Sequence, residues 1–149
     1  MSDRDGGSPH EEFAEVFVDF VRGFGLLDAE TTPCGAPMST AEAHAITVLR
    51  AGGLHQGVLG ERVGLGKSST SRLVDGLEQR GWVRRVPDPD DGRARLLRLT
   101  DKGREVAGGV VRRRADRLSA LLDNVPAARR RSVIEALRLL TEAGRLDAP

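Results

Sequence analysis

The sequence predicts a mainly α-helical fold that contains one small β-hairpin. Two observations indicate it. Apolar residues recur every three or four positions over most of the chain, which is typical of amphipathic helices. The exception is residues 82–100, where two short runs of alternating character flank the turn-forming segment Asp88-Pro89-Asp90-Asp91-Gly92. With 149 residues and 39% hydrophobic content, the chain has the size of one ordinary domain.

The first helix is expected to follow residues 1–7, a charged, glycine-containing stretch expected to be a disordered arm. Ser8-Pro9-His10-Glu11 has the pattern of a capping box with proline at the first helical position. The apolar stripe that follows contains Phe13, Val16, Phe17, Phe20, Val21 and Phe24. Such a stripe can pack on the chain's own core or be shared between two subunits, and its large aromatic area favours a shared role.

Three more helices are expected next. A second capping box, Ser39–Glu42, opens the first of them, and Gly52-Gly53 ends it. A short helix is expected over Gln56–Val63, and after the tight turn Gly64-Leu65-Gly66 another over Lys67–Arg80. A helix, a short glycine-containing turn and a polar-faced helix form a helix-turn-helix, whose second helix can enter a DNA major groove.

The helix over Lys67–Arg80 has two different faces. Its apolar stripe consists of Thr70, Leu73, Val74 and Leu77. Its outward set consists of Lys67, Ser68, Ser69, Ser71 and Arg72. Short hydroxyls let a helix approach a duplex closely, and an arginine can bond guanine with two hydrogen bonds. Serines at the start of a helix also serve as caps, so this pattern alone leaves both interpretations open.

The two runs after this helix are expected to form a wing. Trp82–Val86 is expected to be a strand that Pro87 ends, and Arg93–Thr100 the returning strand. A helix-turn-helix followed by a hairpin is a winged helix. Arg93 and Arg95 are candidate DNA contacts, with Arg93 placed to reach a minor groove and Asp91 to brace it. The alternative is a hairpin whose charges are only solvated, and the tandem arrangement favours the wing.

Two helices complete the chain. The first is long, running from the cap at Thr100-Asp101 to about Asn124-Val125, and the second starts at Pro126 and is expected to stop at Gly144. The candidate dimer interface combines both ends of the chain: Phe13, Val16, Phe17 and Phe20 with Val133, Ile134, Leu137 and Leu140. The expected layout is a single domain over residues 8–149, with dimerisation helices at 8–26 and 101–149 and a DNA-binding module at 39–100.

Charge is distributed unevenly along the chain. Residues 1–45 contain nine acidic and two basic residues, a net charge of −7. Residues 67–98 contain eight basic and five acidic residues, a net charge of +3. A polyanionic partner is therefore expected to contact the second segment. Only 3% of the residues are aromatic, so few rings are available to stack on bases. This favours duplex DNA over single strands or RNA as the partner.

Cys34 is the only cysteine, which excludes an intramolecular disulfide. Cys34 and His44 are candidate effector or redox residues, and three interpretations stay open for the thiol: a structural role, a redox sensor, or a metal ligand with His44. We expect no resident metal and no cofactor. No apolar run has the length of a signal peptide or a membrane span, so we expect a cytoplasmic protein without a membrane partner. The sequence offers no nucleophile with a base and no phosphate loop, so we do not expect an enzyme.

The run LVDGLEQRGWVRRVPDPDDGRARLLRLTDKG resembles the multiple-antibiotic-resistance-regulator (MarR) family of winged-helix transcription factors. The resemblance implies a homodimer that binds a palindromic operator, in repression relieved by a small molecule or an oxidant. It also implies that Ser68, Ser69, Ser71 and Arg72 read the major groove while Arg93 enters the minor groove. The alternatives are a thiol- or metal-responsive regulator of the same fold, and a winged helix that serves protein contacts without specific DNA binding.

Overall fold

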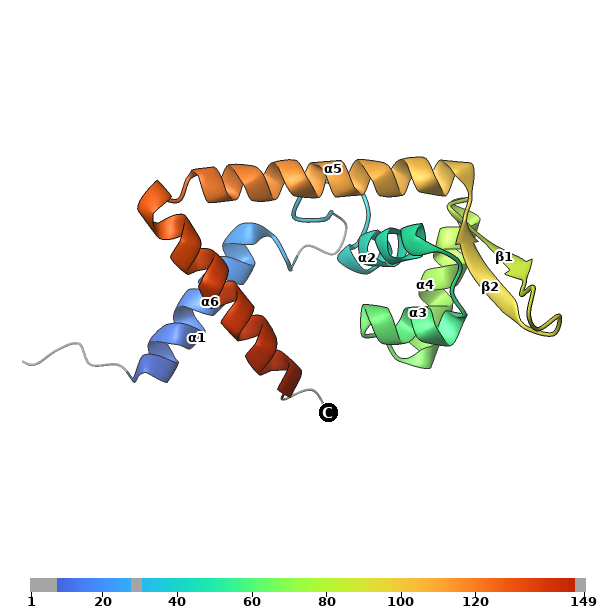
Figure 1. The fold of residues 1–149 in the computed structure, drawn as a ribbon, viewed down its shortest axis with the longest axis horizontal. Helices are drawn as coiled ribbons and strands as arrows, with labels where there is room; N and C mark the ends of the chain where they lie inside the picture. The colour runs from blue at the N-terminus through green and yellow to red at the C-terminus, as the bar shows by residue number, and fades with distance from the viewer. Residues whose placement is uncertain (1–7, 28–30, 147–149) are drawn as a thin grey trace, which may run out of the picture. The chain divides into compact units, whose positions relative to one another are not determined.

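The structure is a computed structural model that describes residues 8–27 and 31–146, so the expected arm over residues 1–7 lies outside it. Within these ranges it is mainly helical, with one small sheet (Figure 1). The elements are α1 (Pro9–Phe24), α2 (Thr40–Val48), the 3₁₀ turn η1 (Leu49–Ala51), α3 (Gln56–Val63), α4 (Lys67–Gln79), β1 (Val83–Pro87), β2 (Arg95–Leu99), α5 (Asp101–Asp123) and α6 (Ala127–Leu146). The chain divides into two compact units, Met1–Arg113 and Arg114–Pro149, and the boundary between them in the sequence falls in α5.

Both predicted capping boxes are present. In α1 the Ser8 side chain accepts a hydrogen bond from the first turn and Glu11 accepts one from the backbone N–H of Ser8 at 2.9 Å. In α2 the Ser39 hydroxyl accepts from the backbone N–H of Glu42, and the Glu42 carboxylate accepts from that of Ser39. Local sequence therefore sets where these two helices begin.

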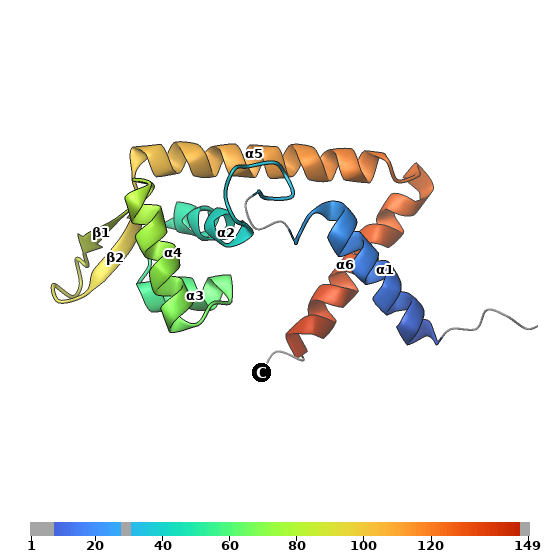
Figure 2. The ribbon, with the colours of Figure 1, turned by 180° about the vertical axis from the view of Figure 1, so that it is seen from behind.

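The helix-turn-helix is held together by close packing inside the first unit. Helices α2, α3 and α4 contact one another, and Figure 2 shows α4 in front of α2 and α3. The fully buried side chains of this unit include Ile46, Leu59, Val74, Leu77, Leu97 and Val110. Thr70 is also buried, and a Cβ atom on Gly60 would lie 2.5 Å from its Oγ1. Gly60 thus lets α3 and α4 approach closely.

The hairpin is antiparallel, with register from Val83 opposite Leu99 to Pro87 opposite Arg95. Leu54 adds an isolated antiparallel bridge to Leu97, which ties the hairpin to the segment before α3. The second strand is shorter than predicted: it begins at Arg95, because the backbone N–H of Ala94 bonds to the carbonyl of Asp91 at 2.9 Å and keeps residues 93–94 in the turn.

Helix α5 starts directly after β2. Thr100 caps it by accepting a hydrogen bond from the backbone N–H of Gly103 at 2.9 Å, and its hydroxyl donates to the carbonyl of Gly81 at 2.6 Å. A Cβ atom on Gly103 would lie 1.9 Å from the carbonyl oxygen of Trp82. Only glycine fits there, since the neighbour is backbone.

Helix α6 corrects one prediction. It continues through Gly144 to Leu146, so Gly144 does not end it. An internal glycine costs a helix only about 1 kcal/mol relative to alanine, and the helix-forming residues around Gly144 tolerate that cost. In the described part of the chain, no helix is both long enough and apolar enough to span a membrane.

Candidate nucleic-acid interface

The first two turns of α4 present an exposed polar surface. Lys67, Ser68, Ser69 and Arg72 are exposed and Ser71 is half-buried, whereas Thr70, Val74 and Leu77 are buried. The cap residue of α4 is Gly66, and no side chain caps this helix. The three serines are therefore helical residues and not caps, and no hydrogen bond within the described ranges occupies their hydroxyls.

The tip of the wing carries Arg93 beside a structured turn. The Asp91 carboxylate accepts a hydrogen bond from the backbone N–H of Arg93 at 3.0 Å. Asp91 thus orders the backbone that carries Arg93 and, among the described residues, makes no ion pair with its guanidinium group. The side chains of Arg93 and Arg95 are exposed and, over residues 8–27 and 31–146, make no ion pair.

His55 joins the wing to the start of α3. Its Nε2 lies 3.0 Å from a carboxylate oxygen of Asp88, and its Nδ1 lies 3.3 Å from the backbone carbonyl of Arg95. Asp88 and Arg95 are on either side of the turn, so this one imidazole holds both arms of the hairpin near the tip.

Two of the eight basic residues between positions 67 and 98 are neutralised by neighbours. Arg80 lies 3.4 Å from the Glu42 carboxylate and over the Trp82 ring. Arg85 donates to Gln56 at 2.9 Å and to Glu78 at 3.0 Å, and its Nη2 lies 3.5 Å from Asp75. The remaining six, Lys67, Arg72, Arg84, Arg93, Arg95 and Arg98, have no ion-pair partner in the described ranges. These six side chains are the cations of the segment that are available to a polyanionic partner.

The Arg85 contacts also place Asp75, whose partner the sequence could not identify. Asp75 faces the wing strand β1 and is part of the contact between α4 and β1. Sequence reasoning missed the whole Arg85 group, since its members are separated by up to 29 positions and no local pattern connects them.

The candidate dimer residues of α1 lie on a largely uncovered face. Phe13, Val16, Phe17 and Phe20 expose between 45% and 63% of their surface, and no residue of α1 is buried. The rings of Phe13 and Phe17 stack with centroids 5.9 Å apart, as do those of Phe20 and Phe24 at 5.5 Å. The stripe is thus preformed, and it has no partner large enough to bury it in the first unit.

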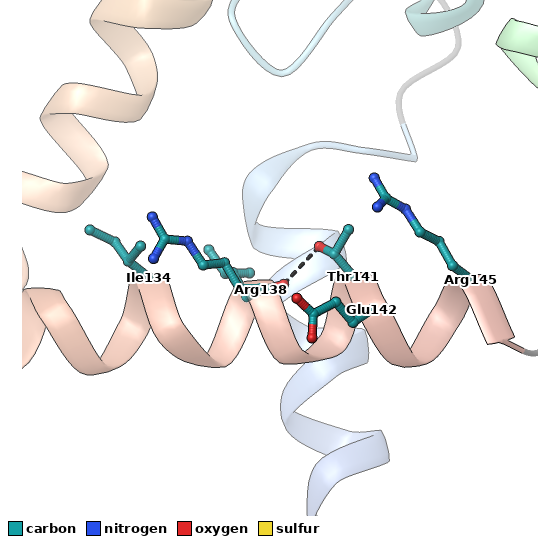
Figure 3. A pocket seen from close by; sticks show the side chains of 6 residues that line it. Ile134, Arg138, Thr141, Glu142 and Arg145 are labelled. Atoms are coloured by element: carbon teal, nitrogen blue, oxygen red, sulfur yellow. Dashed lines mark hydrogen bonds between the residues drawn. The ribbon is translucent and has the colours of Figure 1, made fainter.

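In the second unit, α6 leaves similar side chains uncovered. Val133, Leu137 and Leu140 expose 37%, 53% and 42% of their surface, and Ile134 is half-buried. Figure 3 shows Ile134, Arg138, Thr141 and Arg145 projecting from one side of the helix. The Thr141 hydroxyl donates to the carbonyl of Leu137 at 2.7 Å, so it stays on the helix surface without needing another partner.

Cys34 and His44 do not form a common site. Cys34 is half-buried against the core with its Sγ 3.0 Å from Oγ1 of Thr32. His44 is exposed, and its Nε2 lies 3.3 Å from the carbonyl of Arg62. Across the residues the structure describes, no group of three histidine, cysteine, aspartate or glutamate side chains could hold a metal ion. The role of the thiol stays a prediction.

A family model described as the MarR family matches residues 37–94, the segment that contains the helix-turn-helix and most of the wing. The uncharacterized HTH-type transcriptional regulator YdgJ of Bacillus subtilis (strain 168) is 32% identical over 101 residues. That match takes in 67% of this chain and 62% of YdgJ, so the chain spans less than two thirds of that relative's length.

Solved structures match almost the whole chain. The PcaV transcriptional regulator from Streptomyces coelicolor, in complex with its natural ligand, is 28% identical with a TM-score of 0.65, covering 97% of this chain and 99% of its own. FabT from Streptococcus pneumoniae in complex with DNA is 19% identical with a TM-score of 0.79, covering 91% and 97%. The FabT likeness concerns the fold alone, whereas that to PcaV extends to the sequence.

Proposed function

We propose that this chain, which belongs to the MarR family of winged helix-turn-helix transcriptional regulators, is a cytoplasmic repressor that binds a palindromic operator as a homodimer. A small organic effector releases it. One observation carries the DNA-binding surface: the unpartnered hydroxyls and cations of α4 and the wing tip belong to elements joined by Arg85 and His55. Two groove-reading parts are thereby fixed relative to each other.

In this proposal the two parts read different grooves. Ser68, Ser69, Ser71 and Arg72 of α4 contact base edges and phosphates in the major groove, and Lys67 adds a phosphate contact at the start of the helix. The unpaired backbone N–H groups of the first turn of α4 favour an anion at the same place. Arg93 enters the minor groove and Arg95 contacts the adjoining backbone.

A homodimer is supported by the amount of apolar surface at the two ends of the chain. The aromatic stripe of α1 and the apolar side of α6 expose large side chains that a monomer would leave in water. A symmetric dimer presents two α4 helices to half-sites about one helical turn apart, which requires a palindromic operator.

Release by an organic molecule is supported by an apolar hollow of about 480 Å³ in the first unit. Met38, Trp82, Val106 and Val110 line it together with polar residues of α5. Trp82 lies between the end of α4 at Gln79 and the start of β1 at Val83, so a ligand in the hollow would contact the segment that joins α4 to the wing. The solved PcaV structure contains that regulator's natural ligand, which fits the same mode of control.

The proposal is tested by titrating the full chain against the duplex upstream of its own gene and against random duplex. Each titration is carried out at two salt concentrations. We expect at least about a thousandfold preference for one upstream site at physiological salt. Both affinities should fall with salt, since phosphate contacts release counterions. Equal affinity for the two duplexes would contradict specific regulation, and binding to neither would contradict DNA binding itself.

A further inference from the structure

A second hollow, which is lined by basic residues, lies at the base of the wing. It has a volume of about 420 Å³ and is lined by Leu49 and Arg50 of η1, Gly52, Gly53, Arg98 and Leu99 of β2, and Arg104 of α5. Its size is in the range of small-molecule sites. It brings together three arginines that are separated in sequence, each from a different element.

Two of these arginines lack a counterion. Neither Arg50 nor Arg98 makes an ion pair or a side-chain hydrogen bond among residues 8–27 and 31–146, and both are exposed. Arg104 is anchored by donating to the carbonyl of Leu99 at 2.9 Å, and it pairs with Asp101. Among the described residues, the positive charges of Arg50, Arg98 and Arg104 are therefore balanced only by the negative charge of Asp101.

Backbone geometry holds Arg98 in this place. Arg84 lies opposite Arg98 in the antiparallel register, and two like charges at such a position repel. A Cβ atom on Gly53 would lie 3.0 Å from both Cγ and Nε of Arg98. The absence of a side chain at Gly53 thus lets Arg98 lie across the backbone. Arg98 is thereby held beside Arg84, and neither has an ion-pair partner among the described residues.

The hollow differs from the DNA-binding surface by the face of the hairpin that it uses. Side chains alternate along a strand, so Arg84, Leu96 and Arg98 lie on one face of the hairpin and Arg85 and Leu97 on the other. Arg85 faces α4 through Asp75 and Glu78. Arg98 therefore points away from the helix that reads DNA, and a free molecule is the better occupant than a groove phosphate.

We propose that the hollow formed by Arg50, Arg98 and Arg104 binds the phosphate group of a small phosphate monoester. A monoester carries a charge of about −1.5 to −2 at neutral pH, which matches the excess of positive charge. Guanidinium groups bond phosphate oxygens in pairs. Leu49 and Leu99 at the floor of the hollow are only 3% and 4% exposed, so the arginines supply the recognition.

The test measures binding of inorganic phosphate and of glycerol 3-phosphate to the full chain by calorimetry and by thermal unfolding, with acetate at equal ionic strength as the comparison. We expect saturable binding of both phosphates and a rise in Tm that acetate does not cause, since the ligand would hold η1, β2 and α5 together. Arg98→Ala and Arg50→Ala should each weaken binding at least about tenfold. Arg129→Ala, which removes an exposed charge from α6, should bind as the unchanged protein does.

Either of two results would overturn the proposal: no saturable phosphate binding by the unchanged protein, or equal binding by Arg50→Ala, Arg98→Ala and Arg129→Ala. A DNA titration over a range of salt separates the two sources of phosphate. If the ligand is a free molecule, the slope of the logarithm of the DNA-binding constant against the logarithm of the salt concentration should be the same for Arg98→Ala as for the unchanged protein. A slope reduced by about one, together with lost phosphate binding, would make the DNA backbone the source of the phosphate and overturn the small-molecule assignment.

Discussion

Arg93 stands at the end of the wing with its backbone fixed by Asp91 and its guanidinium group unpaired. We expect Arg93→Ala to weaken operator binding about tenfold to a hundredfold, since a charged hydrogen bond to DNA is lost while the turn is kept. The mass of the protein in solution should not change. A fluorescence titration with labelled operator, beside light scattering, checks both expectations. Arg114→Ala, on α5 outside the wing, is the charge-matched control, and an undiminished affinity of Arg93→Ala would refute the role of the wing tip.

Gly103 is constrained by packing and not by backbone conformation. Its Cβ position lies 1.9 Å from the Trp82 carbonyl oxygen, so Gly103→Ala must separate α5 from the segment that joins α4 to β1. We expect a loss of about 3 kcal/mol in the free energy of unfolding, measured by urea denaturation. Gly109→Ala in the same helix meets no atom within 4 Å and should gain about 0.5–1 kcal/mol from helix propensity. Equal stabilities of the two variants would contradict the close contact.

At the scale of the elements, Arg85 fastens the wing to the helix-turn-helix. It is 37% exposed, so water screens its ion pairs, and we expect Arg85→Ala to cost only about 0.5–1 kcal/mol of stability. The effect on DNA should be larger, about tenfold, because Asp75 and Glu78 would keep unneutralised charges beside α4. Urea unfolding and operator titration measure the two effects. Arg84→Ala removes the same charge from the adjacent position without breaking a contact. Equal losses of stability and of operator affinity in the two variants would show that the Arg85 contacts do not matter.

The helices and strands could be predicted where a short local sequence pattern sets their position. The capping boxes at Ser8 and Ser39 and the glycine turn before α4 were sufficient to locate three helix starts. Several boundaries were wrong: β1, for example, spans Val83–Pro87 and so includes the proline that was expected to end it. The second wing strand begins at Arg95, because the turn hydrogen bonds extend to Ala94, and α6 passes through Gly144, because one glycine is too weak a break.

On the scale of the whole molecule, assembly is expected to depend on the stripe of α1. We expect Phe17→Asp to abolish the proposed dimer at micromolar concentration, since a carboxylate would be buried without a partner in an apolar interface. Val18→Asp adds the same charge at the next residue, about 100° around the helix, and should leave the dimer intact. Sedimentation or light scattering gives the masses. A stable Phe17→Asp dimer would show that the stripe is not in the interface.

Part of the candidate site could not be predicted, because it depends on contacts between residues that are far apart in the sequence. The outward residues of α4 follow from helical periodicity, and Ser68, Ser69 and Arg72 are exposed as that periodicity requires. The partners of Asp75, the bridge of Leu54 to Leu97 and the hollow at Arg50, Arg98 and Arg104 depend on residues brought together from distant positions. No pattern within one element contains that information.

The sequence by itself determined the order of the elements, the polar face of α4 and the family. These follow from periodicity, caps and turn residues, which act over a few positions. Only the tertiary structure decided that the serines of α4 are not caps, that Asp91 acts through the backbone of Arg93, and that Arg85 is neutralised while Arg98 is not. The physical reason is that charge pairing and close backbone approach depend on distance in space, which the fold sets between residues far apart in the chain.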